Sequence, residues 1–242
     1  MKITIIETGR PMASLRSRFP DYPEMFSDLI GGAKPGLSFE SCALGNGERL
    51  PDPESLDGIL ITGSPVGVYD PEPWMSPLMD FIRWAAAART PQVGICFGHQ
   101  AIAQALGGQV KKSDKGWGLG RHSYDITSNA PWMGERDQDT FSLAVSHQDQ
   151  VIAPPPGAAV TAASDFCPYA GLSYIQGPAI SFQGHPEFSD AFATALYENR
   201  RGAPLSDAQV DSATASLSKP HDNALLGQWI AAFYLNAAAA AS

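Results

Sequence analysis

Short apolar runs bounded by Gly, Pro or charged residues recur through the first hundred residues. They lie at residues 3–6, 58–62 and 92–95. None of them alternates polar with apolar positions, so each is typical of a strand buried on both faces, as in a parallel sheet. The sequence therefore predicts a buried parallel sheet that begins at the N-terminus.

Helical spacing separates these runs. Residues 23–30 form one such segment, and residues 74–89 form another with apolar side chains at positions 78, 81, 82 and 85. This spacing of three and four residues places the apolar side chains on one helix face. Strands that alternate with helices predict an α/β fold.

The second half of the chain has a different pattern. Residues 121–127, 141–145 and 179–182 are rich in β-forming residues, which predicts that the sheet continues with antiparallel or mixed strands. A helix stripe follows, formed by Leu225, Leu226, Trp229, Ile230 and Phe233. We expect one α/β domain over residues 1–190 and a helical extension over 191–242 that packs on it, with residues 236–242 frayed.

Composition narrows the class of protein. The 242 residues are 44% hydrophobic and 17% charged, which indicates an ordinary globular protein, and the net charge of −9 argues against a nucleic-acid partner. No apolar run approaches the ~20 residues of a membrane span. Three cysteines exclude a disulfide framework, and the short N-terminal apolar run does not support export, so the sequence predicts a cytoplasmic location.

No pattern in the chain predicts a cofactor. Metal-ligand spacings such as Cys-x-x-Cys are missing, and so is a Walker-type phosphate loop. We therefore expect chemistry that side chains perform without a metal or a nucleotide.

Cys96 stands at the centre of the most informative segment. A predicted strand runs into Gly94, a helical pattern begins just after Cys96, and Gly98 follows two residues later. This is the layout of a nucleophile elbow with cysteine in place of serine. The helix N-terminus favours a thiolate there, and the Phe97 N–H is available to an oxyanion. The alternative is a buried cysteine in a tight turn.

A second segment lies 89 residues further on. His185 and Glu187 follow a predicted strand, and residues two apart on an extended chain point to the same side. The carboxylate could orient an imidazole whose other nitrogen serves Cys96. An exposed His and Glu at a strand end is the alternative for this segment alone.

Together the two segments resemble the class I glutamine amidotransferases, and among them the stand-alone proteins similar to the amidotransferase domain of GMP synthase. The resemblance covers about residues 1–190. It implies a flavodoxin-like, open, mostly parallel sheet with helices on both faces. It also implies that Cys96 is the nucleophile, His185 the general base and acid, and Glu187 the orienting carboxylate.

The same resemblance extends to a loop after the strand at 58–62. Family members supply a backbone N–H from this loop to the oxyanion hole, beside the N–H of Phe97. They commonly have Gly-Gly-Pro or Asn-Gly-Pro, whereas this chain has Gly63-Ser64-Pro65. The donor is therefore Gly63 or Ser64, and a plain Gly/Pro turn is the alternative.

Further residues match family positions near the substrate. These are Gln100, one turn after Cys96, and Ser146 and His147 in a Ser-His-x-Asp segment. His147 is expected to be a wall of the site and not a second base. A solvent-facing glutamine and a structural histidine at a strand end are the alternatives.

The expected function is hydrolysis of the γ-carboxamide of glutamine, or of a γ-glutamyl amide, through a thioester on Cys96. Ammonia would pass to water or to a separate synthase partner, because the chain has no room for the ATP-pyrophosphatase domain that GMP synthase carries. A γ-glutamyl peptidase is the first alternative. A non-catalytic binding protein on the same fold is the second.

Overall fold

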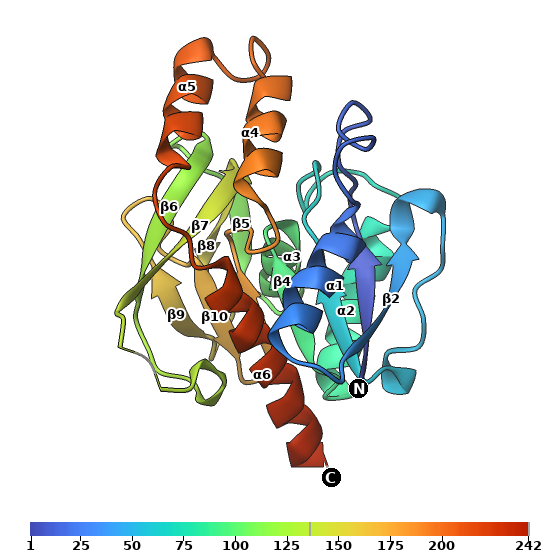
Figure 1. The fold of residues 1–242 in the computed structure, drawn as a ribbon. Helices are drawn as coiled ribbons and strands as arrows, with labels where there is room; N and C mark the ends of the chain where they lie inside the picture. The colour runs from blue at the N-terminus through green and yellow to red at the C-terminus, as the bar shows by residue number, and fades with distance from the viewer. Residues whose placement is uncertain (136, 242) are drawn as a thin grey trace.

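Five parallel strands form the half of the central sheet that carries the N-terminus. The computed structural model describes residues 1–135 and 137–241, and Figure 1 shows the first strands of this half in blue and cyan at one side of the molecule. In spatial order they are β2 (Ser38–Ala43), β1 (Lys2–Glu7), β3 (Gly58–Ile61), β4 (Gln92–Ile95) and β11 (Ala179–Phe182).

Antiparallel strands continue the sheet from β11. They are β10 (Gly171–Tyr174), β9 (Ala159–Ala163), β6 (Gly118–Ile126) and β7 (Thr140–His147). A separate antiparallel pair joins β5 (Gln109–Lys112) to β8 (Asp149–Ala153). The predicted α/β layering and the β-rich second half of the chain are both confirmed.

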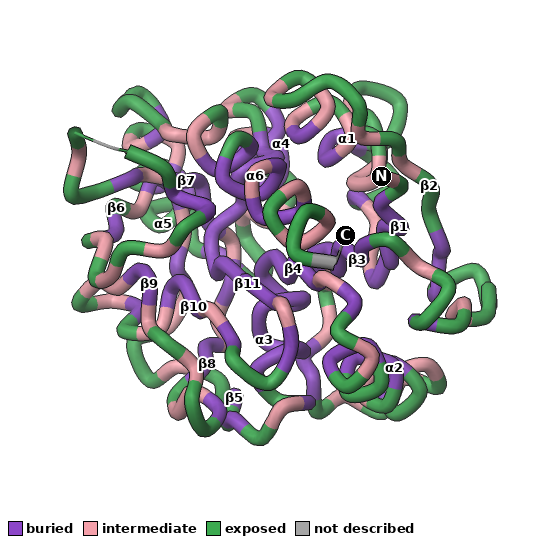
Figure 2. Tube along the Cα trace, turned by 90° about the horizontal axis from the view of Figure 1, so that it is seen from below, coloured by how far each residue is buried: buried purple, intermediate pink, exposed green. Residues whose placement is uncertain are grey.

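Helices cover both faces of the parallel half. Figure 2 shows α1 (Tyr22–Ala33) and α6 (Asn223–Ala241) on one side of the sheet, and α2 (Met75–Ala87) and α3 (Phe97–Ala105) on the other. Strand β3 is apolar throughout because both of its faces are buried. Leu60 belongs to the core under α1 and α6, whereas Ile59 and Ile61 belong to the core under α2 and α3.

Two shorter helices lie over the antiparallel half. Helix α4 (Asp190–Asn199) contacts β7, and α5 (Asp207–Ser216) contacts β6, with a third core cluster beneath them. Single 3₁₀ turns complete the structure at Leu44–Asn46, Pro53–Ser55 and Pro131–Met133.

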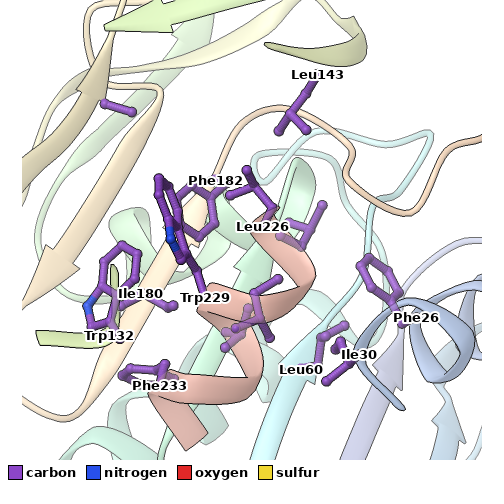
Figure 3. Close-up of a cluster of buried hydrophobic side chains, with 14 of the residues drawn as sticks. Phe26, Ile30, Leu60, Trp132, Leu143, Ile180, Phe182, Leu226, Trp229 and Phe233 are labelled. Atoms are coloured by element: carbon purple, nitrogen blue, oxygen red, sulfur yellow. The ribbon is translucent and has the colours of Figure 1, made fainter. Parts of the chain in front are cut away.

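Helix α6 buries the stripe that the sequence predicts. Trp229 is 2% exposed and meets the rings of Trp132 and Phe141 edge to face, with centroids 5.7 Å apart in each pair. Figure 3 shows Trp229 and Trp132 in this core. The expectation of a frayed tail is wrong for residues 236–241, because α6 continues through residue 241, and residue 242 lies outside the described residues. Its alanines explain this, since alanine has the highest helix propensity. None of the helices in the described part of the chain combines the length and hydropathy of a membrane span.

The burial of Trp229 predicts a large effect of truncation. Trp229→Ala should lower the free energy of unfolding by about 3–5 kcal/mol, because it removes a large side chain from a packed core. Trp84→Ala is the matched control: Trp84 also lies on a helix but is 49% exposed, so about 1 kcal/mol or less is expected. Urea unfolding measures both, and equal losses would contradict this role of α6.

Candidate active site

The carboxyl ends of the parallel strands converge on one edge of the sheet, where ligands of open α/β sheets bind. Thr8 follows β1, Gly63 follows β3, Cys96 follows β4, and the segment from Gln183 follows β11. Because β3, β4 and β11 are adjacent, the three loops after them meet around Cys96.

Cys96 occupies a strained turn between β4 and α3. Its φ is 53° and its ψ is −102°, outside the regions that residues with a Cβ normally adopt. Its N–H donates to the Phe182 carbonyl at 2.9 Å, which fixes the turn to β11. The Cys96 side chain lines two cavities, so the turn presents the thiol at the edge of the sheet.

The turn needs glycine at both flanking positions. A Cβ on Gly94 would lie 2.4 Å from the Gly98 carbonyl oxygen, and one on Gly98 would lie 2.2 Å from the Ile61 carbonyl oxygen. Real Cβ atoms do not approach so closely. The backbone of α3 therefore begins in direct contact with β3 and β4.

His185 and Glu187 form a buried pair beside the thiol. The His185 Nδ1 lies 2.7 Å from Glu187 Oε1, and the ring also has a hydrogen bond with the Cys96 thiol. The Phe188 ring stacks on the imidazole with centroids 3.9 Å apart and planes 7° apart. The His185 N–H donates to the Ala144 carbonyl at 2.9 Å. The ring is thus held by stacking on one face, and the backbone that carries it is held by a hydrogen bond to β7.

Opposing influences act on the charge of His185. Burial lowers its pKa, but Glu187 and Cys96 outweigh burial and raise the pKa to about 10. Because this value lies above the ordinary 6.5, the charged ring stabilises the fold fully below pH 6.5, and that contribution is lost as pH rises to about 10.

Hydroxyl groups from two strand ends hold the loop after β3. The Gly63 carbonyl accepts hydrogen bonds from the hydroxyls of Thr8 at 3.2 Å and Thr62 at 3.1 Å. Ser64 Oγ donates to the Thr8 carbonyl at 2.8 Å. A Cβ on Gly63 would lie 3.0 Å from the His185 ring, so this loop packs directly against the imidazole.

A cavity of about 270 Å³ opens beside Cys96, and Gln100, Ser146 and His147 line it. Gln100 Nε2 donates to the Asp149 carbonyl at 2.8 Å and to Gln183 Oε1 at 3.2 Å. Burial lowers the pKa of His147 to about 3, so its ring is neutral and a weak base. The structure brings every residue singled out from the sequence to this edge of the sheet.

Other residues of the site were missed by the sequence reasoning. Gln183 Nε2 lies 3.7 Å from Cys96 Sγ, and Arg200 lines both cavities at the thiol. Thr8 could have been found, because it directly follows a buried parallel strand, as Gly63 and Cys96 do. Arg200 carries no such signal, since it ends a helix 13 residues after Glu187.

Comparison with known proteins identifies the family. The family model described as glutamine amidotransferase class-I matches residues 45–200, which is more than half of the chain. The chain belongs to the class I glutamine amidotransferases.

Relatives of this amidotransferase include γ-glutamyl peptidase 2 of Arabidopsis thaliana, 32% identical over 143 residues, 58% of this chain and 57% of the relative. A GMP synthase of Aromatoleum aromaticum is 33% identical over 136 residues, 54% of this chain and 25% of the relative. The predicted resemblance to GMP synthase is thereby confirmed.

A solved structure has the same fold. The glutamine amidotransferase from Methylobacillus flagellatus superposes with a TM-score of 0.75 at 21% identity, over 98% of this chain and 94% of the other. The predicted flavodoxin-like sheet is confirmed. Family membership supports amidotransferase or hydrolase activity in general.

Over residues 1–135 and 137–241 we find no cluster of three His, Cys, Asp or Glu that could hold a metal ion.

The balance of influences on His185 predicts the effect of Glu187→Gln. Without the carboxylate, burial should dominate, and the pKa of His185 should fall from about 10 toward or below its ordinary 6.5. Nitrogen-15 NMR of labelled histidine measures the titration. His147 is the internal control, because it should remain neutral at neutral pH in both proteins. An unchanged His185 titration would mean that Glu187 does not set its charge.

Proposed function

We propose that this protein hydrolyses the γ-amide bond of glutamine or of a γ-glutamyl amide through a thioester on Cys96. The observation that carries the proposal is the His185 ring, which is hydrogen-bonded on one side to Glu187 and on the other to Cys96. An activated thiol nucleophile needs this arrangement of base and orienting group.

In the first half-reaction the Cys96 thiolate attacks the γ-carbonyl carbon and forms a tetrahedral oxyanion. The His185 imidazolium then donates its proton to the leaving nitrogen, the C–N bond breaks, and ammonia or an amine departs. Glu187 stabilises the imidazolium and fixes its orientation. The γ-glutamyl group remains on the sulfur as a thioester.

Two backbone N–H groups are proposed to hold the oxyanion. Phe97 N–H belongs to the first turn of α3 and has no hydrogen bond to any residue that the structure describes. For the loop after β3 the hydrogen bonds favour Ser64 over Gly63 as the donor. The Gly63 carbonyl is turned toward Thr8 and Thr62, and in a trans peptide the following N–H points the opposite way.

The second half-reaction reverses the proton transfers. His185, now neutral, accepts a proton from a water molecule that attacks the thioester carbonyl. The C–S bond breaks, glutamate leaves, and Cys96 returns as a thiolate beside the imidazolium. The net reaction adds one water across the amide bond.

The cavity beside Cys96 is proposed to bind the α-amino acid part of the substrate. Gln100, Ser146 and His147 form part of its wall. The low pKa of His147 supports a role for this residue in shape and hydrogen bonding and argues against a second base.

A γ-glutamyl peptidase remains the second candidate, because a relative bears that name. Hydrolysis of glutamine and hydrolysis of γ-glutamyl peptides differ in the size of the leaving group, which must depart on the His185 side of the thiol. A second cavity there is only about 50 Å³, lined in part by Tyr22, Phe188 and Leu196. This favours a small leaving group, and so glutamine over larger γ-glutamyl peptides.

Removal of either reacting group should abolish turnover. Cys96→Ala and His185→Ala should each lower kcat/KM by at least about 10³-fold, and Glu187→Gln by less, because nucleophile and base act as a unit. Release of glutamate from glutamine measures this. Cys42→Ala is the matched control, since Cys42 is a buried free cysteine on the edge strand β2 that lines neither cavity at Cys96, and this variant should retain wild-type activity. Turnover by Cys96→Ala would refute the mechanism.

Assays of the purified chain separate the remaining alternatives. We expect glutamine turnover without a partner and slower turnover of γ-glutamyl dipeptides, because of the small cavity beside His185. Faster dipeptide turnover would favour the peptidase. Labelling of Cys96 by a glutamine-like diazoketone without turnover would indicate that a separate synthase partner activates the site. Neither labelling nor turnover would favour a non-catalytic binding protein.

A further inference from the structure

Arg200 is a half-buried cation at the site with no carboxylate beside it. Other arginines in the described residues pair with acids: the buried Arg121 with Asp190, and the more exposed Arg201 with Glu198 and Asp211. For Arg200 the described residues offer no ion pair. Its charge is therefore uncompensated at the mouth of the active site.

The surroundings of Arg200 hold it without neutralising it. Its Nη1 donates to Ser146 Oγ at 2.7 Å, and the guanidinium stands over the Trp117 ring, 5.7 Å from the centroid. Burial lowers the pKa of Arg200, which reflects the cost of keeping the charge away from water. A guanidinium has five N–H donors arranged as a fork that matches a carboxylate, and only one of them has a partner here among the described residues.

We propose that Arg200 binds the α-carboxylate of the γ-glutamyl substrate and so restricts the enzyme to substrates that carry it. The inference rests on the proposed function and names the residue that would recognise the substrate. A carboxylate on the leaving group has the same chemistry, so the test must distinguish binding of that carboxylate from binding of the α-carboxylate.

The structure favours the α-carboxylate. Trp117, which holds the guanidinium, lines the larger cavity and not the small one beside His185. The larger cavity also contains the Asp149 carboxylate, which accepts a hydrogen bond from Tyr69 at 2.8 Å and has no ion pair within the described residues. Lys112 and Asp70 also line this cavity, so it offers charges of both signs, as the two charges of an α-amino acid require.

Labelling of Cys96 tests the proposal without requiring turnover. A glutamine-like diazoketone carries the α-carboxylate, whereas iodoacetamide is neutral. Arg200→Gln should slow diazoketone labelling by about 10- to 100-fold, the range for one charged hydrogen-bonded contact, and change iodoacetamide labelling less than about twofold. Arg200→Lys should recover part of the loss, because the charge is kept and the fork is lost.

Arg201→Gln is the matched control, because Arg201 is adjacent but pairs with surface acids away from the cavities. It should label like the wild type with both reagents. Equal slowing of both reagents in Arg200→Gln would show a structural role for Arg200 and overturn the proposal. A wild-type protein that reacts with iodoacetamide but not with the diazoketone would instead refute the proposed function.

Steady-state kinetics distinguish the two sources of the carboxylate. Arg200→Gln should raise KM by a similar factor for glutamine, γ-glutamyl methylamide and γ-glutamylglycine, because all three carry the α-carboxylate. It should not change the slow turnover of 4-aminobutanamide, which lacks that group. A loss confined to γ-glutamylglycine would assign Arg200 to the leaving-group carboxylate and overturn the proposal.

Discussion

The contact between the start of α3 and the backbones of β3 and β4 is the constraint on which the site depends. With glycine at 94 and 98, the helix begins close enough to the sheet for the chain to turn at Cys96 within one residue. That turn costs backbone strain, which the surrounding packing and the hydrogen bond to β11 offset. The thiol consequently lies between the loops that follow β3 and β11, where the other groups of the site converge.

Burial determines how strongly these groups interact with one another. His185, Glu187 and Cys96 are each less than a tenth exposed, so their mutual interactions are screened little by water. The same burial opposes a charge on the imidazole, and the charge is kept because the Glu187 carboxylate lies 2.7 Å away on one side and Cys96 is hydrogen-bonded on the other. In a low-dielectric site of this kind, hydrogen bonds and ion pairs are stronger when every group has its partner, and a group left without a partner costs more free energy. The His185 and Glu187 pair therefore acts as one unit.

Charge is distributed unevenly between the molecule and the site. The chain carries a net charge of −9, whereas the cavity beside Cys96 is lined by two cations, Arg200 and Lys112, and two carboxylates, Asp70 and Asp149. Most acidic side chains lie elsewhere on the surface, where water and salt screen them. The partly enclosed guanidinium is screened less, so it can attract a small anion even though the protein as a whole is acidic.

By itself the sequence determined the alternation of strands and helices, the turn at Cys96 and the pairing of His185 with Glu187. These features follow from local periodicity, from glycine spacing and from two residues on one extended segment, all of which are readable within a short window. Only the tertiary structure decided that Thr8 shapes the loop at Gly63, that Gln183 approaches the thiol and that Arg200 reaches the cavity. Those contacts join segments far apart in the chain, and they depend on strand order and on how α4 packs against β7, which no local pattern encodes.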